Sequence, residues 1–382
     1  MAGGFVLKVT RRLLGLFSNK WLMATVLLFC CAASLLFVHH NHSFYDRPIA
    51  EVIKTSQTGS SEETDMHNNK DRLYTQQLTA KLKNGKDKGK LITLTNEYSL
   101  SGAFDQKYHA GHELFVAIDS STDNSLTGTV KDVKRDKYIM IASWLFIFTL
   151  LLVGKKQGFF SVISLAVNGL LLSYALDVYL NKNGLGLLAV CSISAILFTV
   201  ISLLLVNGFN GKTYAAITAT LLGTFISLFI AMIVLKLTSG IGLRYEEMQF
   251  LTRPPKVVFI AGVMVGSLGA VMDVAITMSS SIFGLYEKNT QISIKALKAS
   301  GLEIGKDIMG PMTNILFFAY ISGSIPMLIL YFKNASPLGY TLSMNLSLEL
   351  ARAMAGGIGI VLTIPIGLYT SLYFINRKKA RI

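Results

Sequence analysis

The sequence has 382 residues, of which 52% are hydrophobic and only 15% are charged, and its mean hydropathy is +0.50. This composition excludes a single soluble domain and is typical of a protein with several membrane spans. The net charge of +14 arises outside residues 39–137, because that region holds 14 basic and 14 acidic residues. Basic residues that flank apolar segments are typical of membrane proteins, so we expect the lipid bilayer, and no nucleic acid, as a partner.

The first apolar run, Trp21–Val38, follows four basic residues and is long for a signal peptide. The chain continues with His39-His40-Asn41-His42 rather than with a small-x-small cleavage site. We therefore expect residues 1–38 to form a cytoplasmic N-terminus and an uncleaved transmembrane anchor.

Residues 39–137 are polar and are expected to form an extracytoplasmic region. Their first part, through Asn69, is rich in Ser, Thr, Glu and Asn, which predicts a weakly ordered tether. Later stretches alternate apolar and polar residues between turn residues, a pattern that predicts short antiparallel strands. They read LYTQQLTAKL, KLITLTNEYSL, ELFVAIDS and TGTVKDV. About five strands in this region suit a small barrel of the OB or SH3-like kind.

Residues 138–382 contain further apolar runs, each near the roughly 20 residues that a helix needs to cross hydrocarbon. The runs are Tyr138–Val153, Phe159–Leu180, Leu185–Val206, Tyr214–Leu237, Val257–Ser281, Pro311–Phe332 and Leu348–Ile375. Asn289–Ile308 mixes apolar residues with lysines and predicts a cytoplasmic interfacial helix. The expected fold is an all-α polytopic membrane protein of about eight transmembrane helices, with the small extracytoplasmic β-barrel domain inserted after the first helix.

The basic residues outside residues 39–137 also indicate an orientation. If the N-terminus is cytoplasmic, 15 of these 22 basic residues fall on predicted cytoplasmic segments and seven on predicted outside flanks. Cytoplasmic loops of membrane proteins carry an excess of Lys and Arg. We therefore expect a multi-pass protein of the cell membrane with both termini in the cytoplasm.

The stretch Phe259–Ser281 is apolar and long enough to cross a bilayer, yet it contains Asp273. Small and polar residues follow one another at steps of three or four, which places them on one helix face. They are Gly262, Gly266, Gly269, Asp273, Thr277 and Ser280. Small residues let a neighbouring helix approach closely, and a carboxylate in a membrane costs roughly 2.5–3.5 kcal/mol, so we expect a seam that faces the protein interior.

Two roles for Asp273 stay open. It either lies in the path of a solute or an ion, with Thr277, or it only bonds a neighbouring helix and fixes the packing. Thr313 and Asn314 give the run Pro311–Phe332 a polar stripe and are candidate neighbours of Asp273 on such a path.

The last apolar run carries further candidates for packing and pairing. Gly356 and Gly357 are expected to let this helix pack tightly against a partner helix, as are Gly262, Gly266 and Gly269 in the earlier run. Glu349 and Arg352 are three residues apart, a spacing that allows an internal ion pair.

The histidines do not form a convincing metal site. His39, His40 and His42 lie at a membrane exit, and His109 and His112 flank a turn. A turn does not place two histidines as the HExxH zinc helix does, so we expect no metal and no cofactor.

Several strings resemble the YibE/F family of bacterial multi-span membrane proteins. They are GAVMDVAITMSSSI, ASGLEIGKDIMGPMTNILFFAYISGSIPMLIL, LELARAMAGGIGIVLTIPI, VNGFNGKTYAAITATLLGTFI, NGKDKGKLITLTNEYSLSG and YHAGHELFV. The resemblance extends from about Leu73 to the C-terminus. It implies a plasma-membrane protein with a small extracytoplasmic β domain, and it implies no reaction. It also implies a small or polar residue at position 311, so Pro311 predicts a kink where that span begins.

A transporter-like permease for an unknown small solute or ion is the function that these features favour. With no nucleotide-binding motif, its energy would come from an ion gradient or a partner ATPase. The alternative is a membrane scaffold or sensor whose β domain binds a partner or an envelope component. We expect no enzyme, because Asp273 lacks an evident second catalytic group, and we expect a partner membrane protein or a homo-oligomer.

Overall fold

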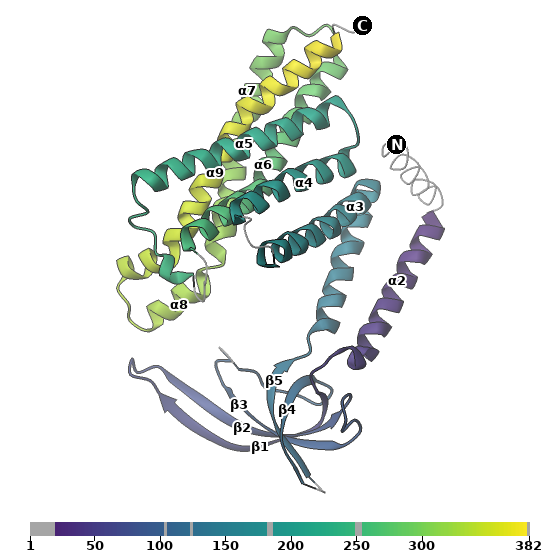
Figure 1. Ribbon diagram of the computed structural model, residues 1–382, viewed down its shortest axis with the longest axis vertical. Helices are drawn as coiled ribbons and strands as arrows, with labels where there is room; N and C mark the ends of the chain where they lie inside the picture. Colours follow the sequence, from purple (N-terminus) through teal and green to yellow (C-terminus); the bar gives the residue numbers. More distant parts are fainter. Residues whose placement is uncertain (1–19, 103–104, 123–124, 182–185, 249–253, 380–382) are drawn as a thin grey trace. The chain divides into compact units, whose positions relative to one another are not determined.

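The computed structural model describes residues 20–102, 105–122, 125–181, 186–248 and 254–379. The chain forms two compact units, Met1–Lys156 and Gln157–Ile382. The first unit contains the only strands among the described residues, and the second unit is helical (Figure 1).

The first unit begins with α2 (Lys20–His40) and the short 3-10 helix η1 (Asn41–Phe44), followed by five strands. The strands are β1 (Ile49–Thr64), β2 (Lys70–Leu82), β3 (Leu91–Ser99), β4 (Glu113–Thr122) and β5 (Ser125–Val133). Every alternating stretch that predicted a strand has become one, from β2 to β5. Their inward residues form one apolar core that includes Leu78, Ile92, Leu94 and Leu114.

The tether predicted up to Asn69 is wrong for Ile49–Thr64, because this segment is the longest strand of the sheet. Only its beginning reaches the core: Ile49, Ala50 and Val52 are buried, whereas most of the rest is exposed. The strand is held instead by its ladder with β2, which extends from Ala50–Leu82 to Thr64–Lys70. Backbone pairing therefore orders a segment whose side chains carry little hydrophobic signal.

The strands pair in the order β1-β2-β3-β5-β4, and β1 meets β4 again over three residue pairs. One pairing departs from the predicted antiparallel arrangement, since β3 and β5 run parallel over Ile92–Thr95. The result is one small five-stranded sheet whose two edges meet over only a short length. A regular barrel of the OB or SH3-like kind stays a prediction.

The helix α3 (Asp136–Asn181) leaves the sheet and holds two of the predicted spans, on either side of Lys155. Lys155 has a φ of 47°, a left-handed conformation that interrupts the helix. Six helices in the described ranges are long and apolar enough to cross a membrane, and a bent pair would make a seventh. The predicted total of eight spans therefore stays a prediction.

The second unit continues from residue 157 of α3 through five more long helices and one short one. They are α4 (Leu187–Asn207), α5 (Gly211–Leu237), α6 (Pro255–Lys288), α7 (Ile294–Ser322), α8 (Ile325–Lys333) and α9 (Leu338–Lys379), with the 3-10 helix η2 (Tyr245–Glu247). The helix α9, yellow in Figure 1, packs against α5, α6 and α7. Val274, Met278, Ile360 and Leu368 are fully buried at the centre of this packing.

The predicted interfacial helix Asn289–Ile308 and the span that follows it form a single helix, α7. Pro311 lies inside α7 without ending it, and the predicted kink and the predicted start of a span at this residue stay predictions. The chain breaks further along, at Gly323 and Ser324, where α7 and α8 meet at a bend of 50°. Pro326 then lies in the first turn of α8. N–H groups in the first turn make no hydrogen bond within the helix, so a proline costs none there.

Candidate functional site

Asp273 lies in the middle of α6, on the face that is turned away from the packed core. Its side chain is exposed in the single chain, whereas the neighbouring Val274 and Ala275 are fully buried. Within the described residues it makes no hydrogen bond and no ion pair, and Thr277, one turn further, is partly buried. The small-residue face of α6 was predicted to point into the protein interior, and at Asp273 it does not do so within a single chain.

The glycines on the same face of α6 have different surroundings. A Cβ atom at Gly266 would collide with the hydroxyl group of Tyr320 in α7, and one at Gly262 would lie 4.0 Å from Nε of Arg352 in α9. A Cβ atom at Gly269 would meet nothing within 4 Å. Close approach of a neighbouring helix thus occurs at Gly266, and the predicted packing role of Gly269 would require a neighbour outside the described residues.

A charged cluster lies beside this face at the Gly262 end. Arg352 donates a hydrogen bond to Glu349 of the same helix, as their spacing indicated, and its guanidinium group lies 5.6 Å from the centre of the Phe259 ring. The Tyr320 hydroxyl group and Nε of Arg352 are buried and have no hydrogen-bond partner among the described residues. Tyr320 had no signal in the sequence, because only the packing of α7 brings it to this cluster.

Thr313 and Asn314 do not bond with Asp273 in this structure. The Thr313 hydroxyl group donates to the Met309 carbonyl oxygen, 2.8 Å away, within its own helix. The Thr313 methyl group instead faces α9, where a Cβ atom at Gly357 would lie 3.4 Å from it. Thr313 also lines an apolar groove of about 410 Å³ between α7 and α9, which Asp273 does not line. The Asn314 side chain is exposed.

Gly356 is a second point of close helix contact. A Cβ atom there would collide with the Leu316 side chain of α7 and would lie 3.3 Å from Cβ of Ser267 in α6. The absence of a side chain at Gly356 therefore lets α6, α7 and α9 converge at one level.

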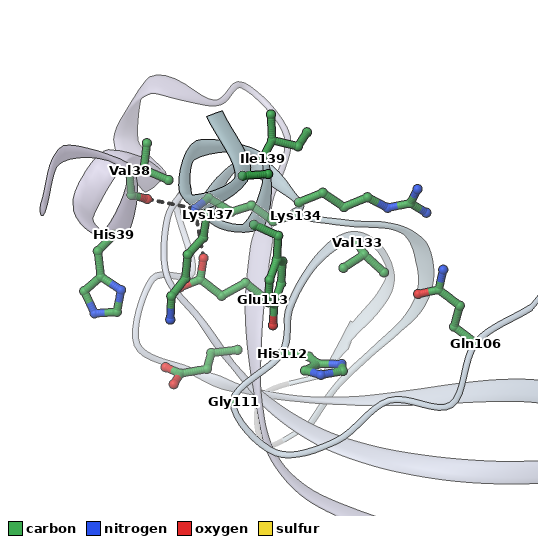
Figure 2. Close-up of a pocket in the computed structure, with 14 residues that line it drawn as sticks. Val38, His39, Gln106, Gly111, His112, Glu113, Val133, Lys134, Lys137 and Ile139 are labelled. Carbon is green, nitrogen blue, oxygen red and sulfur yellow. Dashed lines mark hydrogen bonds and ion pairs between the residues drawn. The ribbon is translucent and has the colours of Figure 1, made fainter. Parts of the chain in front are cut away.

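A second candidate site lies at the base of the sheet, in the first unit. It is a pocket of about 630 Å³ between the end of α2, the sheet and the start of α3 (Figure 2). Its lining includes Val38, Gln106, His112, Glu113, Lys134 and Tyr138.

Lys134 is the centre of this pocket, and only 2% of its side chain is exposed. Its ammonium group lies 3.0 Å from Glu113 of β4, 3.1 Å from Asp136 of α3 and 3.0 Å from the Val38 carbonyl oxygen of α2. Figure 2 shows the ammonium group between the Val38 oxygen and the Glu113 carboxylate. One buried cation thus joins α2, the sheet and α3.

Further hydrogen bonds surround the two carboxylates that Lys134 contacts. His42 lies 2.8 Å from Glu113, and Asp136 accepts hydrogen bonds from Asn41 at 2.9 Å and from Tyr45 at 3.0 Å. Burial favours the neutral forms of Glu113 and Lys134, but their hydrogen bonds outweigh it. The hydrogen bonds and the opposite charges lower the pKa of Glu113 and raise the pKa of Lys134. Both groups are therefore held in their charged forms at neutral pH.

His112 lies in the same pocket and remains uncharged more easily than an ordinary histidine. Burial, and to a smaller extent the nearby His109, lowers its pKa from the ordinary value of 6.5. Its Nδ1 atom is buried and has no hydrogen-bond partner among the described residues. No group of three His, Cys, Asp or Glu side chains suited to a metal ion occurs in the described ranges.

The comparisons with known proteins assign both units to one family. The sequence model of the YibE/F-like protein matches residues 142–377, and that of the YibE/F family N-terminal domain matches residues 43–133. The chain belongs to the YibE/F family. The resemblance seen in the sequence is thus confirmed, and the apolar helices make this YibE/F protein a membrane protein. No curated protein and no solved structure matches the chain.

Proposed function

We propose that this YibE/F protein is a transporter-like permease and that Asp273 lies on the path of its solute or ion. The observation that carries the proposal is an ionisable side chain at the middle of an apolar helix that has no partner among the described residues. A carboxylate facing lipid at this depth is costly and is retained where it has a function. A packing role alone gives no reason for the absence of any hydrogen bond to a neighbouring helix.

The charged cluster at Glu349 and Arg352 supports the same proposal. Gly262 and Gly266 face this cluster, and Asp273 follows Gly266 two turns further along α6, a rise of roughly 10 Å. Two buried donors, the Tyr320 hydroxyl group and Nε of Arg352, have no partner among the described residues and could bond a passing solute or water. The Tyr320 hydroxyl group of α7 and the charged groups of α9 thus lie beside the face of α6 that carries Asp273. Polar groups along one helix face are what a polar path requires.

The substitution Asp273→Asn separates a path from a packing role. Asn keeps the size and the hydrogen-bonding capacity of Asp and removes the ionisable group. We expect the variant to accumulate in the membrane at the normal level and to fail to restore the phenotype of a deletion strain. Asp177→Asn, at the end of α3 where Asp177 bonds Asn181, is the matched control and should restore the phenotype. If Asp273→Asn fully restores the phenotype, Asp273 has only a packing role and the proposal is contradicted.

A second measurement requires no knowledge of the substrate. In a version of the protein without its three native cysteines, Asp273→Cys should react with a small water-soluble thiol reagent in the membrane. Leu222→Cys, on the exposed apolar surface in the middle of α5, should react slowly, because lipid excludes water and disfavours the thiolate. Equal, slow labelling of both positions would mean that no water reaches Asp273, which contradicts the path.

A scaffold or sensor is the second candidate function, and the pocket around Lys134 favours it. A partly open five-stranded Greek-key barrel is the arrangement of an OB fold, a common binding module, and the strand order and short closure of the sheet are compatible with it. In this case the β domain would bind a partner or an envelope component. Asp273→Asn would then restore the deletion phenotype, whereas substitutions in the pocket around Lys134 would not.

A further inference from the structure

A basic pocket lies at one end of the helical unit, away from Asp273. It has a volume of about 640 Å³ and is formed where α5 begins and where α6 and α9 end. The lining consists of Asn210, Gly211, Lys212, Tyr214, Phe283, Glu287, Phe374, Arg377 and Lys378. This is the end of the helices at which the sequence predicts the cytoplasm.

The pocket carries an excess of positive charge that the described residues do not neutralise. Lys212, Arg377 and Lys378 face it together with a single acidic residue, Glu287. In the part of the chain that the structure describes, none of the three cations forms an ion pair or a hydrogen bond. By contrast, the next residue, Lys379, donates to the Ile292 carbonyl oxygen and lies over the Tyr286 ring. The three cations are therefore available to an anion from outside the chain.

The backbone adds donors to the same pocket. Asn210 caps α5: its side chain accepts a hydrogen bond from the Thr213 N–H group, and its carbonyl oxygen accepts one from the Tyr214 N–H group. The N–H groups of Gly211 and Lys212, in the first turn, have no carbonyl partner among the described residues. Free N–H groups and the positive end of the dipole of this 27-residue helix attract an oxyanion.

Aromatic rings form the other wall of the pocket. The rings of Tyr214 and Phe374 have their centres 6.5 Å apart, and Phe283 lies so close to Gly211 that a Cβ atom there would be 3.2 Å from its ring. Tyr214 is also partly exposed on the outer surface of α5. A ligand that fits must combine an anionic group with an adjoining apolar part.

We propose that this pocket binds the phosphate headgroup of an anionic phospholipid. A free phosphate ion would use the cations and the N–H groups but would leave the aromatic wall unused. A lipid uses both, and the pocket lies at the ends of apolar helices, where headgroups occur. Basic pockets between transmembrane helices are known sites for such headgroups.

The proposal can be tested on the full-length protein in detergent by native mass spectrometry during titration with dioleoyl phosphatidylglycerol. The test variant carries Lys212→Gln, Arg377→Gln and Lys378→Gln. The matched control carries Lys288→Gln, Lys295→Gln and Lys306→Gln, which remove the same charge from exposed positions of α6 and α7 outside the pocket. We expect the test variant to lose affinity by about tenfold or more, and the control by less than about twofold.

Two further arms complete the design. Dioleoyl phosphatidylcholine, which has no net charge, should bind at least about tenfold more weakly to the unmodified protein, and Lys378→Gln alone should weaken phosphatidylglycerol binding by a few fold. Equal losses in the test and control variants would overturn the proposal, because they indicate a general effect of charge. Displacement of the lipid by millimolar inorganic phosphate would assign the pocket to a free anion and would also overturn it. Neither result bears on the role of Asp273.

Discussion

Asp273 and Lys134 are both ionisable side chains, and among the described residues only Lys134 has partners. Lys134 contacts two carboxylates and a backbone oxygen, so its burial is compensated. Asp273 has none of these within the described residues. A compensated charge is explained by the fold itself, whereas an uncompensated one requires a further component such as water, a solute or a second chain.

The first prediction concerns Gly266. A leucine at this position would collide with the Tyr320 ring and force α6 and α7 apart, whereas Gly269 has open space in front of it. We expect Gly266→Leu to destabilise the protein by roughly 1–3 kcal/mol. The measurement is the yield and the melting temperature of the purified protein in detergent.

Gly269→Leu is the matched control for this prediction. It adds the same side chain to the same helix and should leave the melting temperature unchanged. A large loss at Gly269 would contradict the packing of a single chain and would indicate that a second chain covers this face. Equal behaviour of the two variants without any loss would remove the case for close packing at Gly266.

At the scale of elements, hydrophobic alternation predicted β2 to β5 but not β1. The inward positions of β2 to β5 face the common core, so most of them are apolar. After Val52, β1 has solvent on both faces of its ladder with β2, and no alternation is selected there. The backbone hydrogen bonds that order this strand leave no trace in the residue types.

For the helices, the apolar runs in the sequence predicted where helices lie but not where they break. Pro311 does not end α7, because the helix continues through it. The actual break occurs at Gly323 and Ser324, and the Ser324 hydroxyl group donates to the Asn345 carbonyl oxygen of α9 there. That contact joins residues from two helices, and a single local stretch of sequence cannot indicate it.

The second prediction concerns the ion-paired joint between α2, the sheet and α3. Lys134→Met would leave Glu113 and Asp136 facing each other without a cation, and removal of one partner of a buried pair costs about 3–5 kcal/mol. We expect the melting transition of this unit to fall by roughly 10 °C. It can be followed by tryptophan fluorescence of the full-length protein, because Trp21 and Trp144, the only two tryptophans, both belong to this unit.

Lys131→Met is the control, since Lys131 is exposed and has no ion pair among the described residues. It should leave the transition unchanged. Adding Glu113→Gln to Lys134→Met removes one of the two uncompensated charges and should recover part of the loss. A variant Lys134→Met that melts like the unmodified protein would show that the joint contributes nothing to stability.

At the scale of the whole molecule, the family and the candidate residue Asp273 were recognisable from sequence, but the pocket around Lys134 was not. Asn41 and Asp136 are 95 residues apart and meet only because the sheet brings the end of α2 next to the start of α3. Glu349 and Arg352 were predicted to pair from their spacing, whereas the contact of Gly266 with Tyr320 depends on how two helices cross. Patterns within one element were thus predictable, and contacts between elements were not.

The last prediction concerns the orientation in the membrane, which follows from the asymmetry of Lys and Arg. In the version without native cysteines, Ser60→Cys in β1 and Asn376→Cys in α9 both occupy exposed positions. An impermeant thiol reagent should label Ser60→Cys in intact cells and should label Asn376→Cys only after the cells are opened. Equal labelling of both in intact cells would contradict an outside β domain with a cytoplasmic C-terminus.

The joint around Lys134 also has a mechanical consequence. The chain enters the sheet from α2 and leaves it into α3 at nearly the same place, and the ammonium group of Lys134 links the Val38 carbonyl oxygen, Glu113 and Asp136. Because these contacts link both connections of the β domain, the domain cannot rotate about only one of them. A pulling force or a torque applied to the β domain would therefore act on α2 and on the start of α3 at the same time.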